Sequence, residues 1–126
     1  MKKVIKTPNA PEPLGPYNQA ILSGNTLYLS GQVAINPVTG ELVKGTVEEE
    51  TEQVMQNLKA VLETAEMTFE NVVKTSIFLS SMEDFSKVNG VYGMYFTEGT
   101  APARETVEVA NLPKYVNVEI SMIAVK

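Results

Sequence analysis

The chain has 126 residues, 44% of them hydrophobic, which is enough for one core and too short for two ordinary domains, so we expect a single domain over residues 1–126. Fifteen acidic and ten basic residues give a net charge of −5, which disfavours nucleic acid and anionic membranes as partners. The chain has no His, Cys or Trp, which excludes histidine bases, thiol nucleophiles, disulfides and most zinc ligand sets.

The beginning of the chain carries no recognisable targeting signal. Residues 1–8 lack the long apolar run of a signal peptide, and no later run approaches transmembrane length. We therefore expect a cytoplasmic protein.

The first half of the chain predicts three short strands. A strand at Val4-Ile5 is closed by the proline-rich residues 8–16, which cannot pair as a central strand. Residues 19–23 and 26–30 read as two strands joined by Gly24-Asn25, a two-residue hairpin signal. Residues 36–40 then predict a loop.

A helix is predicted to begin near Thr46. Thr46 and Glu49 have the spacing of a capping box. The acidic residues 48–52 suit a helix N-terminus better than a metal site, because hard cations need oxygens that converge from several directions. Apolar residues then recur at helical spacing and predict one buried stripe: Val54, Leu58, Val61, Leu62 and Ala65.

The second half of the chain predicts a strand, a helix and two more strands. Residues 72–80 alternate with the period of a strand. Residues 81–84 resemble a helix cap, and the helix after them has a predicted buried stripe: Phe85, Val88, Tyr92, Tyr95 and Phe96. Residues 103–109 and 116–125 predict the last two strands, joined by a turn at 111–114.

This order of elements predicts an α+β fold, a six-stranded, mainly antiparallel sheet with two helices on one face. The last strand is apolar on both sides, with Val118 and Ile120 on one and Ile123 and Val125 on the other. Such a strand is usually buried on both faces, but two helices can cover only one. We expect the bare face to be covered by oligomerisation.

The candidate functional site centres on Arg104, just inside a predicted strand, where its planar fork of donors can be held rigidly for a carboxylate or phosphate. If strands 103–109 and 116–125 form a hairpin, Thr106 lies near Glu119 and Arg104 projects to the same face. The three side chains would then share one pocket. A structural salt bridge between Arg104 and Glu119 explains the same pattern equally well.

Five short motifs in the same order resemble the RidA branch of the Rid (YjgF) family over nearly the whole chain. They are Gly15-Pro16-Tyr17, Ser30-Gly31-Gln32, Asn36-Pro37-Val38-Thr39-Gly40, Asp84-Phe85 with Val88-Asn89, and Pro102-Ala103-Arg104 with Leu112-Pro113-Lys114. Each motif alone is weak, whereas together they make a specific match.

The resemblance implies a homotrimer with a chorismate-mutase-like fold, in which the sheets form a central barrel and the active sites lie in clefts between subunits. It also implies a 2-iminobutanoate/2-iminopropanoate deaminase, which hydrolyses reactive 2-imino acids or their enamine tautomers to 2-keto acids and ammonia. Pyridoxal-phosphate dehydratases acting on threonine and serine release these imines. The family protein itself carries no cofactor and no metal.

The resemblance also assigns the catalytic roles. Arg104 would grip the substrate carboxylate, and Glu119 would activate the attacking water or stabilise the protonated imine. Gly31 would allow close approach of the substrate, and Tyr17 would line the cleft. The alternative for Tyr17 is a core or interface aromatic.

Three further residues are assigned more weakly. Asn89 would shape the site or its interface, or is simply a satisfied polar residue on a helix, and Ser30 is a strand-end hydroxyl. Thr106 stands where several members have Cys and would contribute its backbone carbonyl. The loop at 97–101 is shorter than in familiar members and lacks an aromatic residue before Pro102.

Two other functions stay open beside the deaminase. The same pocket could serve a non-catalytic regulatory trimer that senses a keto or amino acid. A third possibility is the endoribonuclease or translation inhibitor after which parts of the family are named. The absence of His and the net charge of −5 argue against it, because RNA cleavage usually needs a proton-transfer pair and phosphate-binding charge.

Overall fold

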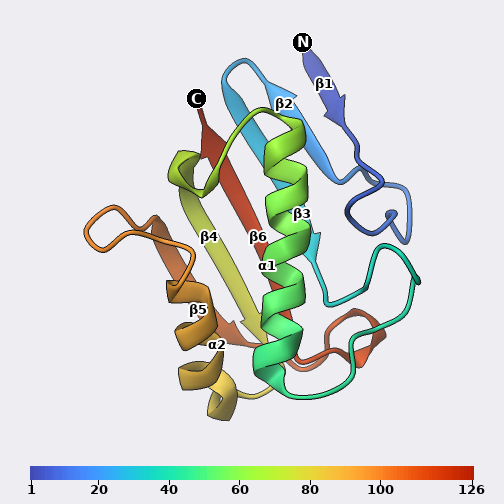
Figure 1. The fold of residues 1–126 in the computed structure, drawn as a ribbon, viewed down its shortest axis with the longest axis vertical. Coiled ribbons are helices and arrows are strands. Elements are labelled where there is room, and N and C mark those ends of the chain that lie inside the picture. Colours follow the sequence, from blue (N-terminus) through green and yellow to red (C-terminus); the bar gives the residue numbers. More distant parts are fainter.

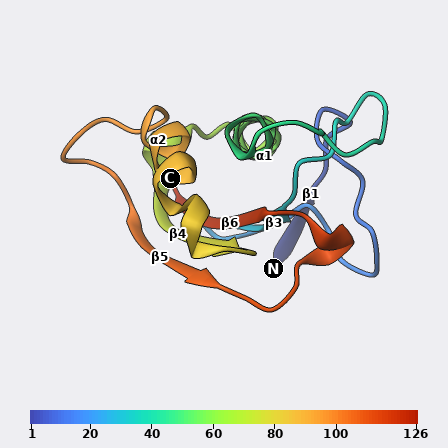
Figure 2. The ribbon, with the colours of Figure 1, turned by 90° about the horizontal axis from the view of Figure 1, so that it is seen from below.

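The structure, a computed structural model, describes all 126 residues as one six-stranded sheet with two helices (Figure 1). The strands lie in the order β1-β2-β3-β6-β4-β5. The elements are β1 (Lys2–Ile5), β2 (Ala20–Ser23), β3 (Thr26–Gln32), α1 (Val47–Thr64), β4 (Val72–Leu79), α2 (Phe85–Gly93), β5 (Ala103–Glu108) and β6 (Val118–Val125). Both helices cover the same face of the sheet, as Figure 2 shows. The predicted α+β architecture is confirmed.

The predicted hairpin between the last two strands is wrong. β5 pairs with β4 in parallel, and β6 pairs antiparallel with both β3 and β4. β4 therefore separates β5 from β6, and the nine residues between them cross the end of β4. The central place of β6 agrees with its apolar residues on both faces, because a central strand gains two partners and more burial than an edge strand.

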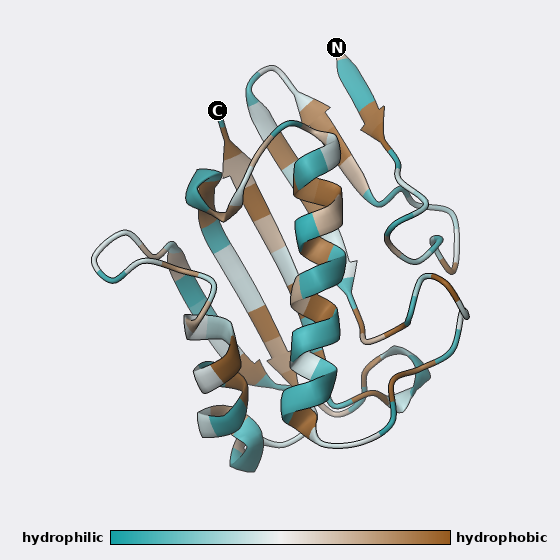
Figure 3. Cartoon of the chain, in the orientation of Figure 1, coloured by the Kyte–Doolittle hydropathy of each residue, from teal (hydrophilic) through white to brown (hydrophobic).

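Helix α1 begins with the predicted capping box. The Thr46 hydroxyl accepts a hydrogen bond from the Glu49 backbone N–H, and the Glu49 carboxylate accepts one from the Thr46 N–H at 3.1 Å. Its predicted stripe is buried against the sheet, with Val54, Leu58 and Val61 all 0% exposed. Figure 3 shows hydrophilic and hydrophobic residues alternating along this helix. Each buried aliphatic side chain of this kind contributes about 1.5–3 kcal/mol to stability.

The side chain of Gln19 holds the proline-rich segment before β2. Its amide nitrogen donates to the carbonyl oxygens of Thr7, Ala10 and Pro11, and its oxygen accepts from the Thr7 N–H at 2.7 Å. Gln19 is buried, so these four bonds replace the water that its amide loses. The segment cannot pair in the sheet, and this clamp fixes its path next to Tyr17 instead.

Both helices lie on one side of the sheet, so no helix covers the opposite face (Figure 2), and that face carries a row of apolar residues. The row crosses four neighbouring strands through paired positions: Val4 with Ile21, Ile21 with Tyr28, and Tyr28 with Ile123. Val4 and Tyr28 are 48% and 50% exposed. We call this surface, with Val125, the open face. Neither helix is long and apolar enough to cross a membrane.

Candidate active site

Arg104 lies on β5 at the free edge of the sheet, and its guanidinium is held by helix α2. Nη1 of Arg104 donates to Oδ1 of Asn89 at 2.8 Å. The guanidinium carbon lies 5.1 Å from the ring centroid of Tyr92 and 5.8 Å from that of Phe85, within the range of cation–π contact. We call Phe85, Asn89, Tyr92, Arg104 and Thr106 the Arg104 cluster.

The spacing of the cluster residues on α2 explains how they meet Arg104. Phe85, Asn89 and Tyr92 are separated by four and three residues, so they lie on one side of the helix. The Tyr92 hydroxyl donates to the Thr75 hydroxyl on β4 at 3.0 Å, and Thr75 is the register partner of Arg104. Burial raises the pKa of the Tyr92 phenol, so this donor stays neutral. One hydrogen bond occupies the guanidinium, and its other N–H groups remain able to bind an anion.

Glu119 lies near the start of β6, on the face of the sheet that points away from the helices. The salt bridge of this chain joins Lys74 to Glu105 at 2.9 Å, and Glu119 takes no part in it. Glu119 is partly buried, and desolvation raises the pKa of its carboxyl. A carboxylate with a raised pKa and no internal partner is suited to exchange a proton with a ligand.

Gly31 provides the space that Glu119 occupies. A Cβ atom at position 31 would lie 2.8 Å from Cδ of Glu119, so any side chain there would displace the carboxylate. The β3–β6 register shifts between Leu29 and Gln32, and this irregularity places Gly31 beside Glu119. The close approach attributed to Gly31 is therefore present, but it is used by Glu119.

Tyr17 and Ser30 lie next to Gly31 and hold the loop that precedes β2. The Tyr17 hydroxyl accepts from the Leu14 N–H at 3.1 Å, and the Ser30 hydroxyl donates to the Asn18 carbonyl oxygen at 2.6 Å. Tyr17 is 47% exposed and lines a small cleft together with Gly31. We call Tyr17, Ser30, Gly31 and Glu119 the Glu119 cluster.

The two clusters lie on opposite faces of the sheet, which corrects the expectation of one pocket within a chain. Arg104 is paired with Thr75, whose side chain faces the helices, whereas Glu119 is paired with Phe78, whose side chain faces away from them. Thr106 is on the face of Arg104, as predicted. The alternative of an Arg104–Glu119 salt bridge is also wrong, because Arg104 is bound to Asn89.

The contacts of the guanidinium with the rings of Phe85 and Tyr92 were not predicted from the sequence, in which both rings were assigned to a buried stripe. Phe85 is 37% exposed, so it is a wall of the Arg104 cluster rather than core. The sequence signal that could have predicted these contacts is the spacing of Phe85, Asn89 and Tyr92, which are four and three residues apart and so lie on one side of a helix. No three acidic side chains converge to form a cation site.

Comparison with known proteins identifies the family. The family model described as Endoribonuclease L-PSP, the Rid or YjgF family, matches residues 7–126. The chain belongs to the Rid family. A RutC family protein of Pyrococcus horikoshii is 52% identical, with 100% of this chain and 99% of the relative aligned.

Two further relatives extend the comparison. The 2-iminobutanoate/2-iminopropanoate deaminase of Mus musculus is 47% identical over 100% of this chain and 93% of its own length. The structure of the Rid family protein YyfA of Yersinia pestis superposes with a TM-score of 0.96 at 48% identity, covering 100% of both chains. The fold and the RidA-type resemblance found in the sequence are confirmed.

Proposed function

We propose that this Rid family protein hydrolyses 2-imino acids such as 2-iminobutanoate and 2-iminopropanoate, and their enamine tautomers, to 2-keto acids and ammonia. The observation that carries the proposal is the Arg104 guanidinium, which contacts two aromatic rings and one amide oxygen and keeps most of its donors free. Identity of 47% to a deaminase over the whole chain supports the same reaction.

Arg104 binds the substrate carboxylate in this proposal. A guanidinium offers two parallel N–H groups to a carboxylate, which fixes orientation as well as position. The cation–π contacts with Phe85 and Tyr92 and the hydrogen bond to Asn89 hold the group in place before the substrate arrives. The fold therefore fixes the guanidinium in advance, so that a bound substrate already presents its C2 atom to the attacking water.

Glu119 exchanges the protons of the reaction. As a carboxylate it removes a proton from water while the water oxygen bonds to C2 of the protonated imine and the electron pair of the C=N bond moves to nitrogen, which leaves a neutral carbinolamine. The nitrogen of the resulting carbinolamine then takes that proton from Glu119, the C–N bond breaks with its electron pair leaving on ammonia, and the C2 hydroxyl becomes a carbonyl as its proton passes to the Glu119 carboxylate or to water. A raised pKa makes Glu119 a stronger base for the first step and a ready acid for the second.

One chain cannot present both groups to one substrate, because the two clusters lie on opposite faces of its sheet. We propose that the site is completed between neighbouring subunits of a homotrimer, the Arg104 cluster of one subunit facing the Glu119 cluster of the next. The apolar row on the open face supports this arrangement, because packing the sheets into a central barrel removes Tyr28 and its neighbours from water.

RNA cleavage, after which the family model is named, is less well supported. The net charge of −5 gives no general attraction to a polyanion, and no His is present to transfer protons. A purely regulatory role would use the Arg104 cluster as a carboxylate sensor. Such a regulatory role would not explain why Glu119 has no partner and a raised pKa.

The decisive assay follows trapping of a freshly generated imine. An amino acid oxidase produces 2-iminobutanoate in the presence of semicarbazide, and the deaminase is expected to lower the rate of semicarbazone formation from the imine. Sedimentation equilibrium on the same sample is expected to give a trimer. A trimer that leaves trapping unchanged at every concentration would refute the activity, and a monomer with full activity would refute the shared site.

A further inference from the structure

Asn89 of the Arg104 cluster is followed in the chain by Gly90, and no other asparagine of the chain precedes a glycine. Asparagine before glycine is the dipeptide most prone to deamidation, because glycine has no side chain to hinder attack of its backbone nitrogen on the asparagine amide. Both residues are exposed, and a Cβ atom at position 90 would meet nothing within 4 Å. The surrounding structure therefore leaves room for this attack.

The Arg104 guanidinium polarises the side-chain amide of Asn89. Nη1 of Arg104 donates to Oδ1 of Asn89 at 2.8 Å, which draws electrons away from Cγ, the carbon that a nucleophile attacks. Negative charge develops on Oδ1 when a nucleophile adds to Cγ, and a positively charged donor already in place stabilises that charge. The hydrogen bond involves the amide oxygen and not the amide nitrogen, so the nitrogen stays able to leave.

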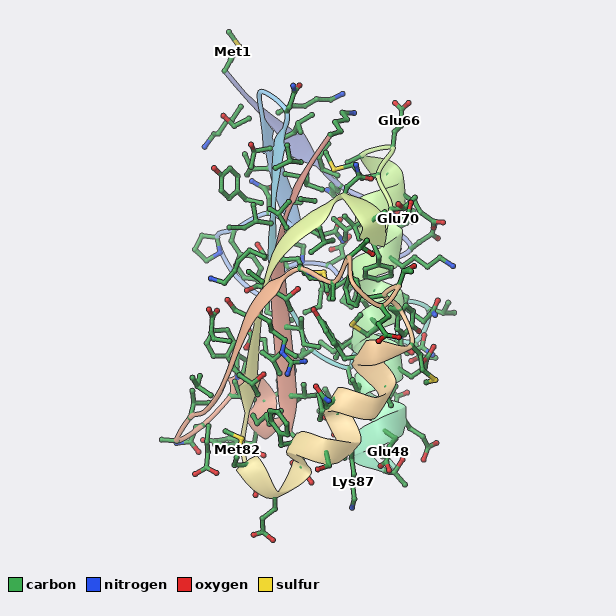
Figure 4. All side chains as sticks on the ribbon, turned by 90° about the vertical axis from the view of Figure 1, so that its left-hand side faces the viewer. Met1, Glu48, Glu66, Glu70, Met82 and Lys87 are labelled. Atoms are coloured by element: carbon green, nitrogen blue, oxygen red, sulfur yellow. The ribbon has the colours of Figure 1, made fainter.

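Helix α2 fixes this pair of residues only weakly. A helix protects asparagine, because each backbone N–H is bound to the carbonyl oxygen four residues before it. α2 has nine residues, two of which are glycines, and Asp84 at its N-cap makes no side-chain hydrogen bond to it. Both features weaken a helix. Figure 4 shows α2 at the surface, with Lys87 pointing away from the rest of the fold. Local opening of this short helix releases the Gly90 nitrogen for attack.

We propose that Asn89 is a deamidation site whose slow reaction inactivates the protein. The Gly90 backbone nitrogen loses its proton to water and bonds to Cγ of Asn89. The bond from Cγ to Nδ2 then breaks with its electron pair, and Nδ2 takes a proton and leaves as ammonia, so that a cyclic imide remains. Water adds to either imide carbonyl carbon, and the bond from that carbon to the Gly90 nitrogen breaks. The product is aspartate or isoaspartate at position 89, and the net change replaces the amide NH₂ by OH.

Either product changes the group that holds Arg104. An aspartate offers two charged oxygens to the guanidinium, and such an ion pair is stronger than one hydrogen bond to a neutral amide. Isoaspartate adds a methylene to the backbone of α2, which disturbs the spacing that places Phe85, Asn89 and Tyr92 on one side of the helix. The guanidinium is then lost to a substrate carboxylate. This loss of activity rests on the proposed function, whereas the deamidation itself does not.

Peptide mass spectrometry tests the modification directly. Full-length wild type, Gly90→Ala and Arg104→Ala are held for days in mildly alkaline buffer, and isoaspartate is counted by enzymatic methylation. The wild type should lose the Asn89 amide and keep that of Asn25, which is exposed in a turn but followed by Thr. Gly90→Ala should react at least about fivefold more slowly, the factor that the helix propensity of alanine alone gives. Arg104→Ala should react about tenfold more slowly, because the charge on Oδ1 is no longer stabilised.

Activity assays on the same samples test the consequence. Imine hydrolysis by the wild type should fall in step with the modified fraction, and Gly90→Ala should begin at the wild-type rate and keep it. Fresh Asn89→Asp reproduces one product. It should bind 2-oxobutanoate, the keto-acid product, about tenfold or more weakly than the wild type in calorimetry, because its own carboxylate occupies Arg104.

Several results would overturn the proposal. A wild-type Asn89 amide that stays intact, or is lost no faster than that of Asn25, would refute the site, as would a Gly90→Ala protein that reacts at the wild-type rate. Equal rates in Arg104→Ala would refute the part played by the guanidinium. Modified protein that binds 2-oxobutanoate like fresh protein would refute the inactivation. If the wild type never hydrolyses imines, the proposed function fails, and the mass spectra still decide whether Asn89 deamidates.

Discussion

Replacement of Gly31 by Ala tests whether catalysis depends on the position of Glu119. The new Cβ would lie 2.8 Å from Cδ and 3.0 Å from Cγ of Glu119, whereas carbon atoms rest in contact at about 3.5–4.0 Å. The carboxylate must therefore move by about 1 Å. A displacement of that size in a catalytic group costs about a hundredfold in rate. We expect kcat/KM for imine hydrolysis to fall by about that factor.

The fold should tolerate Gly31→Ala. The backbone of Gly31 is not in the left-handed region, and Ala at such a position gains about 0.4–1 kcal/mol by restricting the unfolded chain. Gly90→Ala is the matched control, because a Cβ there meets nothing within 4 Å. It should leave kcat/KM unchanged. Imine trapping and thermal melts of both variants give the comparison, and a Gly31→Ala protein with wild-type kcat/KM would refute the role of Glu119.

Two further substitutions address the charged groups. Arg104→Lys keeps the positive charge but loses the two-pronged guanidinium. We expect kcat/KM to fall about a hundredfold while the melting temperature stays close to that of the wild type. A large loss of stability with unchanged activity per folded molecule would show instead that Arg104 is structural. Glu119→Gln should abolish most turnover while 2-oxobutanoate still binds, and unchanged turnover would leave Glu119 only a structural role. Burial raises the pKa of the Glu119 carboxyl above its ordinary value of 4.5. The kcat/KM of the wild type should therefore increase with pH as Glu119 loses its proton, at pH values above 4.5. The Glu119→Gln variant should show no such increase. The raised pKa also means that the ionised form of Glu119 is disfavoured in the folded chain. The contribution of Glu119 to the free energy of unfolding therefore falls as pH rises from 4.5 through the raised pKa. At about pH 7 the Glu119→Gln variant, which is neutral, should be no less stable than the wild type.

The local elements were predictable because their signals are local. The capping box of Thr46 and Glu49 and the hairpin turn at Gly24 act within a few residues. Pairing of β5 was not predictable from its neighbours in sequence. The turn after it fits a hairpin, but β6 is apolar on both faces and gains more by lying between β3 and β4.

That one pairing decides the geometry of the site. Had β5 and β6 been adjacent, Arg104 and Glu119 would have shared a face; with β4 between them, they do not. The contacts of Arg104 with Phe85 and Tyr92 depend on where α2 packs, which no local pattern specifies. The residue types of the site were therefore predictable from the sequence, and their grouping was not.

The central claim, that Arg104 and Glu119 of neighbouring subunits form one site, is tested most directly by mixing two inactive variants. Arg104→Ala and Glu119→Gln chains are refolded together in equal amounts, with each refolded alone as a control. In random trimers about a quarter of the subunit boundaries join an intact Arg104 to an intact Glu119. We predict that the mixture recovers about a quarter of wild-type imine hydrolysis. A mixed trimer no more active than either variant alone would contradict the shared site.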